Sequence, residues 1–295
     1  MHYKIGAHVT IAGGYTQALH KISAMGGNCM QIFSASPRGW NFAKPTEEEI
    51  TDFKALKDKL AIDPVYFHAS YLINLANSER GGQLAKQLLV NELKIASNLG
   101  VRGSIVHLGS FKNGSAKSPR GLALSEAEGL FDADKPADYS LLVASIKEIL
   151  EKTPDDTYFI IENAGNRKIG LKFEEIGKII KEVSSDRLKL CLDTCHANDA
   201  GYDFSTSDKL KEFLQHFNDT IGLDRLEVIH TNDSRNARGS LRDQHANIGE
   251  GTIGADVFPL LLHHPKLKKL PFILEVPGEG SGPTKESIEA LKKLI

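Results

Sequence analysis

The sequence has few cysteines and no long apolar run, and both absences narrow the class of protein. Its 295 residues include three cysteines, Cys29, Cys191 and Cys195, and no Cys-x-x-Cys pair. This small, odd number argues against a disulfide framework and against a structural zinc knuckle. No apolar run could span a membrane, and the N-terminus resembles neither a signal nor a transit peptide. We therefore expect a cytoplasmic protein with no membrane partner.

The sequence also lacks a strong excess of charge, a long linker and low-complexity tracts. Its formal net charge of −2 argues weakly against a nucleic-acid partner, although bound divalent cations would reverse the local field. With 41% hydrophobic residues, residues 1–295 can form one domain with one large core. The least regular segment, at about 110–140, is expected to be a surface insertion, or alternatively a loop that shapes a cleft.

Eight strand-like apolar runs alternate with helical patterns. This order predicts an α/β fold, a closed (β/α)8 TIM barrel in which crossover helices join parallel strands. An open, doubly wound sheet is the alternative. The runs are Lys4–Val9, Cys29–Ser34, Val65–Ala69, Ser104–Leu108, Tyr158–Asn163, Leu188–Thr194, Leu226–Thr231 and Phe272–Val276.

The ends of the intervening helices have recognisable signals. Thr46 and Glu49 predict a capping box at one helix start, and Gly100 predicts the end of a helix that covers Gln83–Leu99. Further helices are predicted at Leu141–Leu150, Phe173–Val183, Leu210–Phe217 and Lys285–Ile295.

Six consecutive predicted strands end at or near a histidine or a carboxylate. In a barrel, these ends converge on the face that carries active sites. One such histidine is usually a packing residue, but several buried charges are costly unless they are paired or bind metal. Gathered carboxylates would also raise one another's pKa values, and cations remove that cost. The residues are His68, His107, Glu162, Asp193, His230 and Glu275, with His196 just beyond the sixth strand.

Asp193 has two interpretations when it is considered alone. With His196, three residues later, it could bind a metal ion. Alternatively, it could cap the helix that follows its strand. The other strand ends favour metal binding.

A second group of candidates lies in the glycine-bearing loop after the seventh strand. Alternate residues of an extended segment point the same way, so Asp243 and His245 could bind one ion together with His196. An ordinary polar turn is the alternative. The nine candidates exceed what one ion needs and suit three ions with open positions. Their imidazole-rich, thiolate-free chemistry favours zinc, with manganese or iron as alternatives, and suits phosphodiester hydrolysis.

Two further residues lie close to these candidates. His8 ends the first predicted strand, and we expect it to orient a ligand or a water molecule. Cys195 is expected to face away as a small apolar filler. A Cys–His nucleophile is the alternative, but nothing in the sequence marks a stabilised thiolate.

The sequence resembles the endonuclease IV family of apurinic/apyrimidinic endonucleases over nearly its whole length. The resemblance implies a zinc-dependent TIM barrel that hydrolyses duplex DNA 5′ to abasic sites and leaves a 3′-hydroxyl and a 5′-deoxyribose phosphate, in base excision repair. A monomer would suffice for this activity. The motifs are specific in combination: GAHVTIAGG at 6–14, HASYLINL at 68–75, IENAG at 161–165, CLDTCHANDAGYD at 191–203, IHTNDS at 229–234, DQHANIGEGTIG at 243–254 and ILEVPG at 273–278.

The matching positions imply a role for each candidate ligand. Glu162 and Glu275 would be the catalytic carboxylates, with Glu275 orienting the attacking hydroxide or accepting its proton. Three zinc ions are implied, with His68 and His107 on the first, Glu162 between the first and the second, Asp193, His230 and Glu275 on the second, and His196, Asp243 and His245 on the third.

The resemblance also implies that side chains enter the duplex and that the abasic nucleotide is flipped out. Arg38, Tyr71 and Leu72 match the positions that do this. An abasic site has lost stacking, so its extrusion costs less, and planar or apolar side chains can hold the kink. The alternatives are helix-start packing for Tyr71 and Leu72 and an ordinary surface charge for Arg38.

The sequence departs from the family pattern at two places. Gln244 stands where the family usually has arginine, and Arg235, Arg238 and Arg242 are candidates to replace that phosphate contact. The stretch between His107 and Glu162 is longer than usual. Two other functions are compatible with such a barrel, namely a metal-dependent sugar isomerase or epimerase and a metal-dependent binding protein without catalysis.

Overall fold

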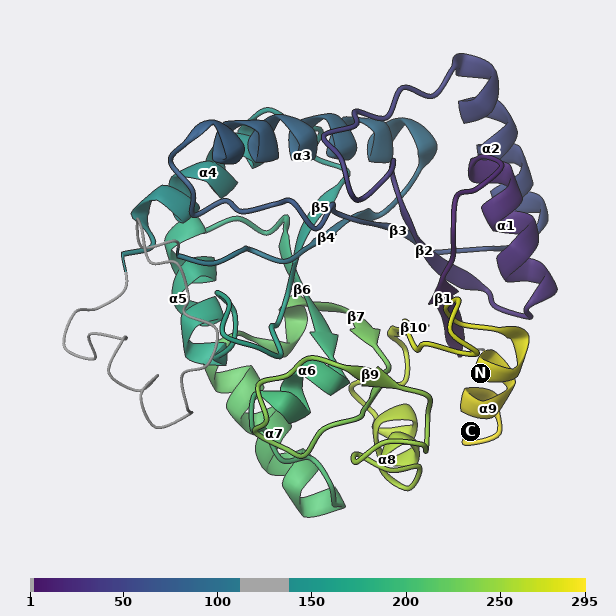
Figure 1. The fold of residues 1–295 in the computed structure, drawn as a ribbon, viewed down its shortest axis with the longest axis vertical. Coiled ribbons are helices and arrows are strands. Elements are labelled where there is room, and N and C mark those ends of the chain that lie inside the picture. The colour runs from purple at the N-terminus through teal and green to yellow at the C-terminus, as the bar shows by residue number, and fades with distance from the viewer. Residues whose placement is uncertain (1–2, 112–137) are drawn as a thin grey trace.

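Eight parallel strands close into a barrel, and helices surround it (Figure 1). The structure is a computed structural model that describes residues 3–111 and 138–295. Neighbouring strands follow the order β1-β10-β7-β6-β5-β4-β3-β2, and β1 pairs with both β2 and β10. This closure confirms the predicted TIM barrel and excludes the open sheet. The barrel strands are β1 (Lys4–His8), β2 (Cys29–Phe33), β3 (Val65–His68), β4 (Gly103–Val106), β5 (Tyr158–Glu162), β6 (Leu188–Asp193), β7 (Leu226–His230) and β10 (Pro271–Leu274).

The helices begin and end where local chemistry permits. The Thr46 side chain and the Glu49 side chain form the expected capping box, and Gly100 ends a long helix in the left-handed conformation. The helices are α1 (Tyr15–Ala24), α2 (Glu47–Lys59), α3 (Arg80–Leu99), α4 (Ser140–Glu151), α5 (Phe173–Val183), α6 (Thr194–Asp199), α7 (Ser207–Thr220), the 3-10 turn η2 (Leu223–Arg225), α8 (Val257–His263) and α9 (Lys285–Lys292). Among the described helices, none is long and apolar enough to cross a bilayer.

The apolar core has two parts. The larger part lies between the barrel and the helices. The smaller part fills the inside of the barrel, and we call it the barrel plug. Its members come from seven strands and are Cys29, Tyr66, Ile105, Ile160, Cys191, Val228 and Ile273. Inward-facing side chains of a TIM barrel stack in layers. The plug is one such layer, and the next layer toward the C-terminal ends of the strands lies directly on it.

A short antiparallel pair, β8 (Asp233–Ser234) and β9 (His245–Ala246), follows the seventh barrel strand. Its two-residue strands are too short for a periodic pattern, and the sequence did not predict them. The buried carboxylate of Asp233 fixes the adjoining loop, because it accepts backbone N–H groups from Gly249, Gly251 and Ile253 at 2.9–3.1 Å. Most of the expected insertion at about 110–140 lies outside the described residues.

Two adjacent glycines of α3 provide a test of the packing. A Cβ on Gly82 would lie 1.7 Å from the backbone oxygen of Asn77, whereas a Cβ on Gly81 would lie 3.4 Å from a flexible side-chain atom of the same residue. We predict that Gly82→Ala lowers the free energy of unfolding by at least about 2 kcal/mol through overpacking. Gly81→Ala, the matched control, should leave it unchanged or raise it by up to about 1 kcal/mol. Denaturant unfolding measures both values, and equal effects would contradict the close approach.

Candidate metal centre

The predicted ligands form the side-chain layer above the barrel plug. Residues two positions apart on a strand point to the same side. Each plug residue is therefore followed, two positions later, by a polar side chain that points into the barrel mouth, as Ile160 is followed by Glu162. The residues that follow a plug residue in this way are Gln31, His68, His107, Glu162, Asp193, His230 and Glu275, and His8 of β1 lies in register with Gln31. The six strand-end residues predicted from the sequence thus converge, and Gln31 is a seventh member.

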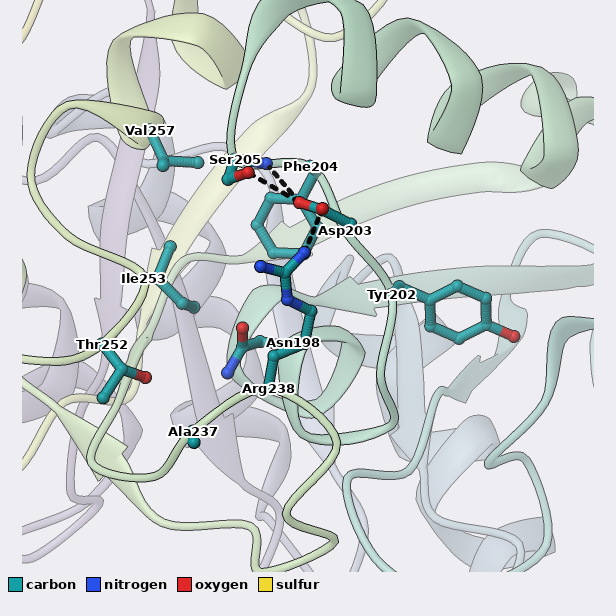
Figure 2. Close-up of a pocket in the computed structure, with 10 residues that line it drawn as sticks. All are labelled: Asn198, Tyr202, Asp203, Phe204, Ser205, Ala237, Arg238, Thr252, Ile253 and Val257. Atoms are coloured by element: carbon teal, nitrogen blue, oxygen red, sulfur yellow. Dashed lines mark hydrogen bonds and ion pairs between the residues drawn. The ribbon is translucent and has the colours of Figure 1, made fainter.

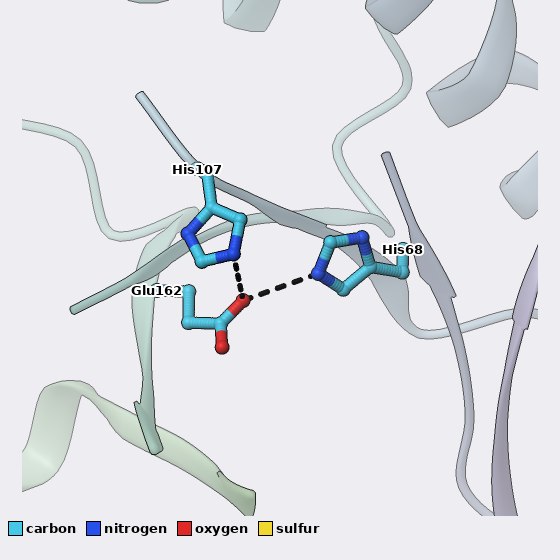
Figure 3. A group of neighbouring side chains, drawn as sticks. All are labelled: His68, His107 and Glu162. Atoms are coloured by element: carbon cyan, nitrogen blue, oxygen red, sulfur yellow. Dashed lines mark hydrogen bonds and ion pairs between the residues drawn. The ribbon is translucent and has the colours of Figure 1, made fainter. Parts of the chain in front are cut away.

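The first group of possible ligands is His68, His107 and Glu162 (Figure 3). The Nε2 atoms of both histidines face one oxygen, Oε2 of Glu162, at 3.1 Å and 3.3 Å. The Nδ1 of His68 lies 2.9 Å from the carbonyl oxygen of Ala69. A carbonyl only accepts, so Nδ1 carries a proton, and in a neutral ring the lone pair is on Nε2, the atom that faces Glu162.

The second group gathers three carboxylates around one imidazole. Its members, Glu162, Asp193, His230 and Glu275, offer ligand atoms that all lie within 4.8 Å of one another. His230 Nδ1 is 3.1 Å from an oxygen of Glu162 and 3.1 Å from an oxygen of Glu275. Three carboxylates this close are an unfavourable arrangement unless positive charge lies among them.

The third group consists of His196, Asp243 and His245. His196 Nε2 is 2.8 Å from Asp243 Oδ1 and 3.3 Å from His245 Nε2. The other ring nitrogen of His196 lies 2.9 Å from the carbonyl oxygen of Asn163, which leaves Nε2 directed at its two neighbours. These atoms lie on α6, on β9 and on the loop that precedes β9, outside the barrel strands, yet they adjoin the strand-end layer.

The pKa shifts express the charge balance of these groups. Burial alone would raise the pKa of Glu162, but His107 and His230 and the hydrogen bonds from His196 and His230 hold it well below its usual value. Burial raises the pKa of Asp193. Burial would lower the pKa of His196, yet Asp193 and Asp243 raise it well above its usual value. Without cations, the carboxylates thus need charged imidazoles as neighbours. Neutral imidazoles with bound divalent cations satisfy the same balance, so the donor set fits metal ions.

Asp193 satisfies both interpretations that the sequence left open. Its Oδ1 accepts the backbone N–H of His196 at 2.8 Å and caps α6. Its Oδ2 accepts a hydrogen bond from Asn232 at 2.6 Å and lies 3.5 Å from His245 Nε2. One carboxylate thus starts the helix that carries His196 and also faces the candidate ligands.

Asp243 reaches the site by a route that differs from the expected one. Its backbone is left-handed, with φ of 55°, and the expected extended conformation is wrong. The carboxylate of Asp199 holds this conformation, because its Oδ2 accepts the Asp243 N–H at 2.9 Å while its Oδ1 accepts the hydroxyl of Ser234 at 2.7 Å. Asp199 is completely buried. The sequence analysis missed it, and its only signal was a carboxylate three residues after His196.

Other supporting residues were also missed. Asn232 donates to Asp193 Oδ2 and accepts the backbone N–H of Glu275 at 2.8 Å, so it joins the ends of β6 and β10. Asn163 makes two hydrogen bonds with the backbone of Asp193. The signal for both was an asparagine directly after or close to a strand end. Such asparagines are also common in ordinary turns.

Cys195 does not face away from the site, which corrects the expectation from the sequence. Its sulfur lies within 4.8 Å of ligand atoms on Asp193 and His245. Burial and the charge of Asp193 raise the pKa of the thiol, which disfavours the thiolate in the metal-free site. His8 ends β1 and lies 3.7 Å from Glu275, where it was expected to orient a neighbour.

A pocket of about 320 Å³ opens above these groups. Tyr71 lines it and is 66% exposed, and the adjacent Leu72 is also exposed. Arg38 lies on the neighbouring loop, which a hydrogen bond from Ser70 to the carbonyl oxygen of Pro37 ties to the Tyr71 loop. The exposure of both apolar side chains argues against the alternative that they pack at a helix start.

The three arginines considered as replacements for a contact at position 244 have different surroundings. Arg238 lines a separate pocket between the loops after β6 and β7, where it is paired with Asp203 (Figure 2). Arg235 donates to the carbonyl oxygen of His245 at 3.0 Å. Arg242 is exposed beside Asp243. Two of the three therefore already have partners within the chain.

The fold and the site together define a TIM-barrel protein whose mouth is built from histidines and carboxylates. A family model described as "Xylose isomerase-like TIM barrel" matches residues 19–294. Two similar relatives carry the name "Probable endonuclease 4". The one from Thermosipho africanus is 35% identical over 99% of this chain and 98% of its own length, and the one from Methanosphaerula palustris is 34% identical over 99% and 98%.

The solved structures point to the same family. The crystal structure of endonuclease IV from Thermus thermophilus has a TM-score of 0.80 and 29% identity, and the match covers 99% of this chain and 97% of that one. A D-tagatose 3-epimerase-like protein has a TM-score of 0.69 at 20% identity, which shows a shared barrel only. The chain belongs to the endonuclease IV family, and it is an enzyme of the nuclease, or phosphodiesterase, class.

Zinc should stabilise the metal-free protein. Because cations would relieve the repulsion among Glu162, Asp193 and Glu275, we predict a rise in Tm on addition of zinc, with about 2.7 kcal/mol gained per site at 100 times its Kd. Calorimetry of chelator-treated protein, titrated with zinc, measures the gain. The His107→Ala variant, as a control, should retain the fold and gain less. An unchanged Tm in the wild type would contradict metal binding here.

Proposed function

We propose that this protein is a DNA-repair endonuclease that hydrolyses the phosphodiester 5′ to abasic sites in duplex DNA. The products would be a 3′-hydroxyl and a 5′-deoxyribose phosphate. One observation carries the proposal, namely three adjoining groups of possible metal ligands beneath an open pocket. A phosphodiester is an anion that needs charge neutralisation and an activated water molecule, and multinuclear sites supply both.

Three zinc ions per chain are proposed, one for each group. His68 and His107 would hold the first with Glu162, which would also reach the second. Zinc would supply Lewis acidity, a lowered pKa of coordinated water and charge neutralisation at the phosphate. The remaining ligands are divided between two ions, with Asp193, His230 and Glu275 on the second and His196, Asp243 and His245 on the third.

The residues of the chain contribute orientation and charge. Glu275 lies at the edge of the pocket, where its carboxylate can orient a water molecule and accept a proton from it. Glu162 is fully buried, so its position is fixed and it cannot leave the ring of imidazoles. His196 and Asp243 lie at the wall of the pocket, where they would approach the departing oxygen.

The exposed side chains around the pocket are proposed to hold the damaged duplex. Tyr71 and Leu72 present planar and apolar surface to fill the gap left by a missing base, and Arg38 lies on the adjoining loop. An abasic nucleotide is extruded more readily than a paired one, which would favour damaged over intact DNA. These surfaces support the choice of abasic DNA as the substrate.

A sugar epimerase on the same barrel is the second candidate function. Epimerases among the structural neighbours share the fold at 20% identity or less. Such an enzyme needs one or two ions, so it would leave His196, Asp243 and His245 without an evident role. The third group therefore favours the nuclease.

The nuclease proposal is tested with a duplex that contains one tetrahydrofuran abasic analogue. The zinc-loaded wild type should nick it and leave an intact duplex uncut. His68→Ala and Glu162→Ala should each lower the nicking rate by more than about 100-fold, since residues that merely support metal ligands already change activity by about 10–100-fold. Metal analysis of the same samples should give about three zinc ions in the wild type. A single ion per chain, or full activity in either variant, would contradict the proposal.

Lys168 is proposed as a phosphate contact that the sequence analysis missed. It is exposed, and it lines the metal-site pocket and two adjoining pockets. His107 lines the same pocket, and burial, together with His68, His196 and the charge of Lys168, lowers the pKa of His107 to about 4. A cation at this position would suit a chain that has Gln244 in place of arginine.

Removal of this cation should change the salt dependence of DNA binding. For Lys168→Met we predict that the slope of log affinity against log salt falls by about 1, the value for one lost phosphate contact. The half-saturating enzyme concentration in single-turnover nicking gives the affinity. Lys168→Arg should retain the slope, and Lys181→Met, an exposed change on α5, serves as the control. A slope in Lys168→Met equal to that of the control would exclude the contact.

A further inference from the structure

Gln31 is a buried polar residue that the proposed chemistry does not use. It lies on β2 in the same layer as the candidate ligands and is completely covered. Its side-chain amide lies between two of these candidate ligands, Glu275 and His230, and the side chain of His8. Nε2 is 2.5 Å from Glu275 Oε1 and 2.9 Å from His8 Nδ1, and Oε1 is 2.7 Å from His230 Nε2.

The chemistry of these neighbours determines which way the amide points. A carboxylate oxygen can only accept a hydrogen bond, so the NH₂ group of Gln31 must face Glu275. The reversed amide would place two oxygen atoms 2.5 Å apart. The NH₂ group then donates one hydrogen bond to Glu275 and one to Nδ1 of His8, and the carbonyl oxygen faces His230.

This orientation determines the proton position on His230. An amide oxygen only accepts, so Nε2 of His230 must carry the hydrogen that it donates to Gln31. In a neutral ring the lone pair is then on Nδ1. That atom faces Glu162 and Glu275 at 3.1 Å each and Asp193 at 3.8 Å.

We propose that Gln31 is a positioning residue that makes Nδ1 the metal-binding atom of His230 and turns Glu275 toward the same ion. The inference rests on the proposed metal site and extends it to a residue that touches no ion itself. A metal-bound histidine generally donates its other N–H to a partner that fixes its tautomer, and here one amide fixes both a histidine and a carboxylate. Loss of the amide should weaken binding at this one position by about 10–100-fold.

The test uses the full-length protein loaded with ¹¹³Cd in place of zinc and labelled with ¹⁵N-histidine. In the wild type, cadmium should couple to Nδ1 of His230, and the Nε2 proton should exchange slowly with water. The His230→Gln variant identifies the signal. In Gln31→Met, the Nε2 proton should exchange rapidly, and chelator competition should show one of the bound ions held about 10–100-fold more weakly.

Two further variants separate the role of Gln31 from a general loss of packing. Gln31→Glu keeps an acceptor for His230, and its buried carboxyl would share a proton with Glu275, so it should retain cadmium coupling at Nδ1. Gln87→Met, on the exposed face of α3, should behave as the wild type. Circular dichroism and Tm verify that each variant is folded.

The outcomes also distinguish the two proposals from each other. Absence of bound cadmium in the wild type would overturn the metal site itself, and the role of Gln31 with it. Cadmium coupled to Nε2 of His230 in the wild type would overturn the role of Gln31 alone. The same conclusion would follow from a Gln31→Met protein with unchanged proton exchange and unchanged affinity.

Discussion

The functional end of the barrel depends on one buried carboxylate. Glu162 has no exposed side-chain surface, and its oxygens face four imidazoles, His68 and His107 on one oxygen and His196 and His230 on the other, at 3.1–3.3 Å. A lone carboxylate in this position would be strongly disfavoured, because burial removes its hydration. The surrounding imidazoles offset the free-energy cost of burying this carboxylate, and bound cations would offset it further. The ionised Glu162 at the centre of the site therefore needs positive charge around it. This need explains why several neighbouring strands end in histidines that face it.

The barrel makes this arrangement predictable from the sequence. Strand side chains alternate, so a polar residue two positions after a buried apolar one lies above it in the same interior column. The pairs Tyr66 with His68 and Ile160 with Glu162 show this rule, and the strand-end ligands follow from it. The residues that support these side chains could not be predicted from this rule. Asp199 and Gln31 are ordinary polar residues in the sequence, and their roles arise from distant contacts. Asp199 contacts a residue 44 positions away in the sequence, and Gln31 contacts two residues that are 199 and 244 positions away. Convergence of Asp243 and His245 was expected, but the left-handed backbone of Asp243 was not, since local patterning does not reveal which distant carboxylate will hold a strained turn.

The barrel layer alone does not separate a nuclease from a sugar epimerase. Both can present histidines and carboxylates at strand ends, and distant epimerases share the fold. The proposed nuclease function rests on the third group, which is built differently, because His196 lies on α6 and His245 lies on β9. Its position depends on the loops after β6 and β7. The proposed function thus rests on the elements added to the barrel mouth, whereas the barrel strands alone indicate only the fold.

Those added loops must be rigid to place the candidate ligands, and two buried carboxylates outside the three ligand groups hold the loops in place by hydrogen bonds. Asp233 accepts several backbone N–H groups of the loop that follows β9, and Asp199 holds the backbone of Asp243. Gln244, by contrast, is exposed, and its side chain accepts a hydrogen bond from Asn236. A change at such a position alters a surface contact without moving the ligands on either side of it. The departure from arginine at 244 therefore leaves the candidate ligands in place, and under the proposed function Lys168, which lines the pocket, would contact the phosphate without any change in the barrel.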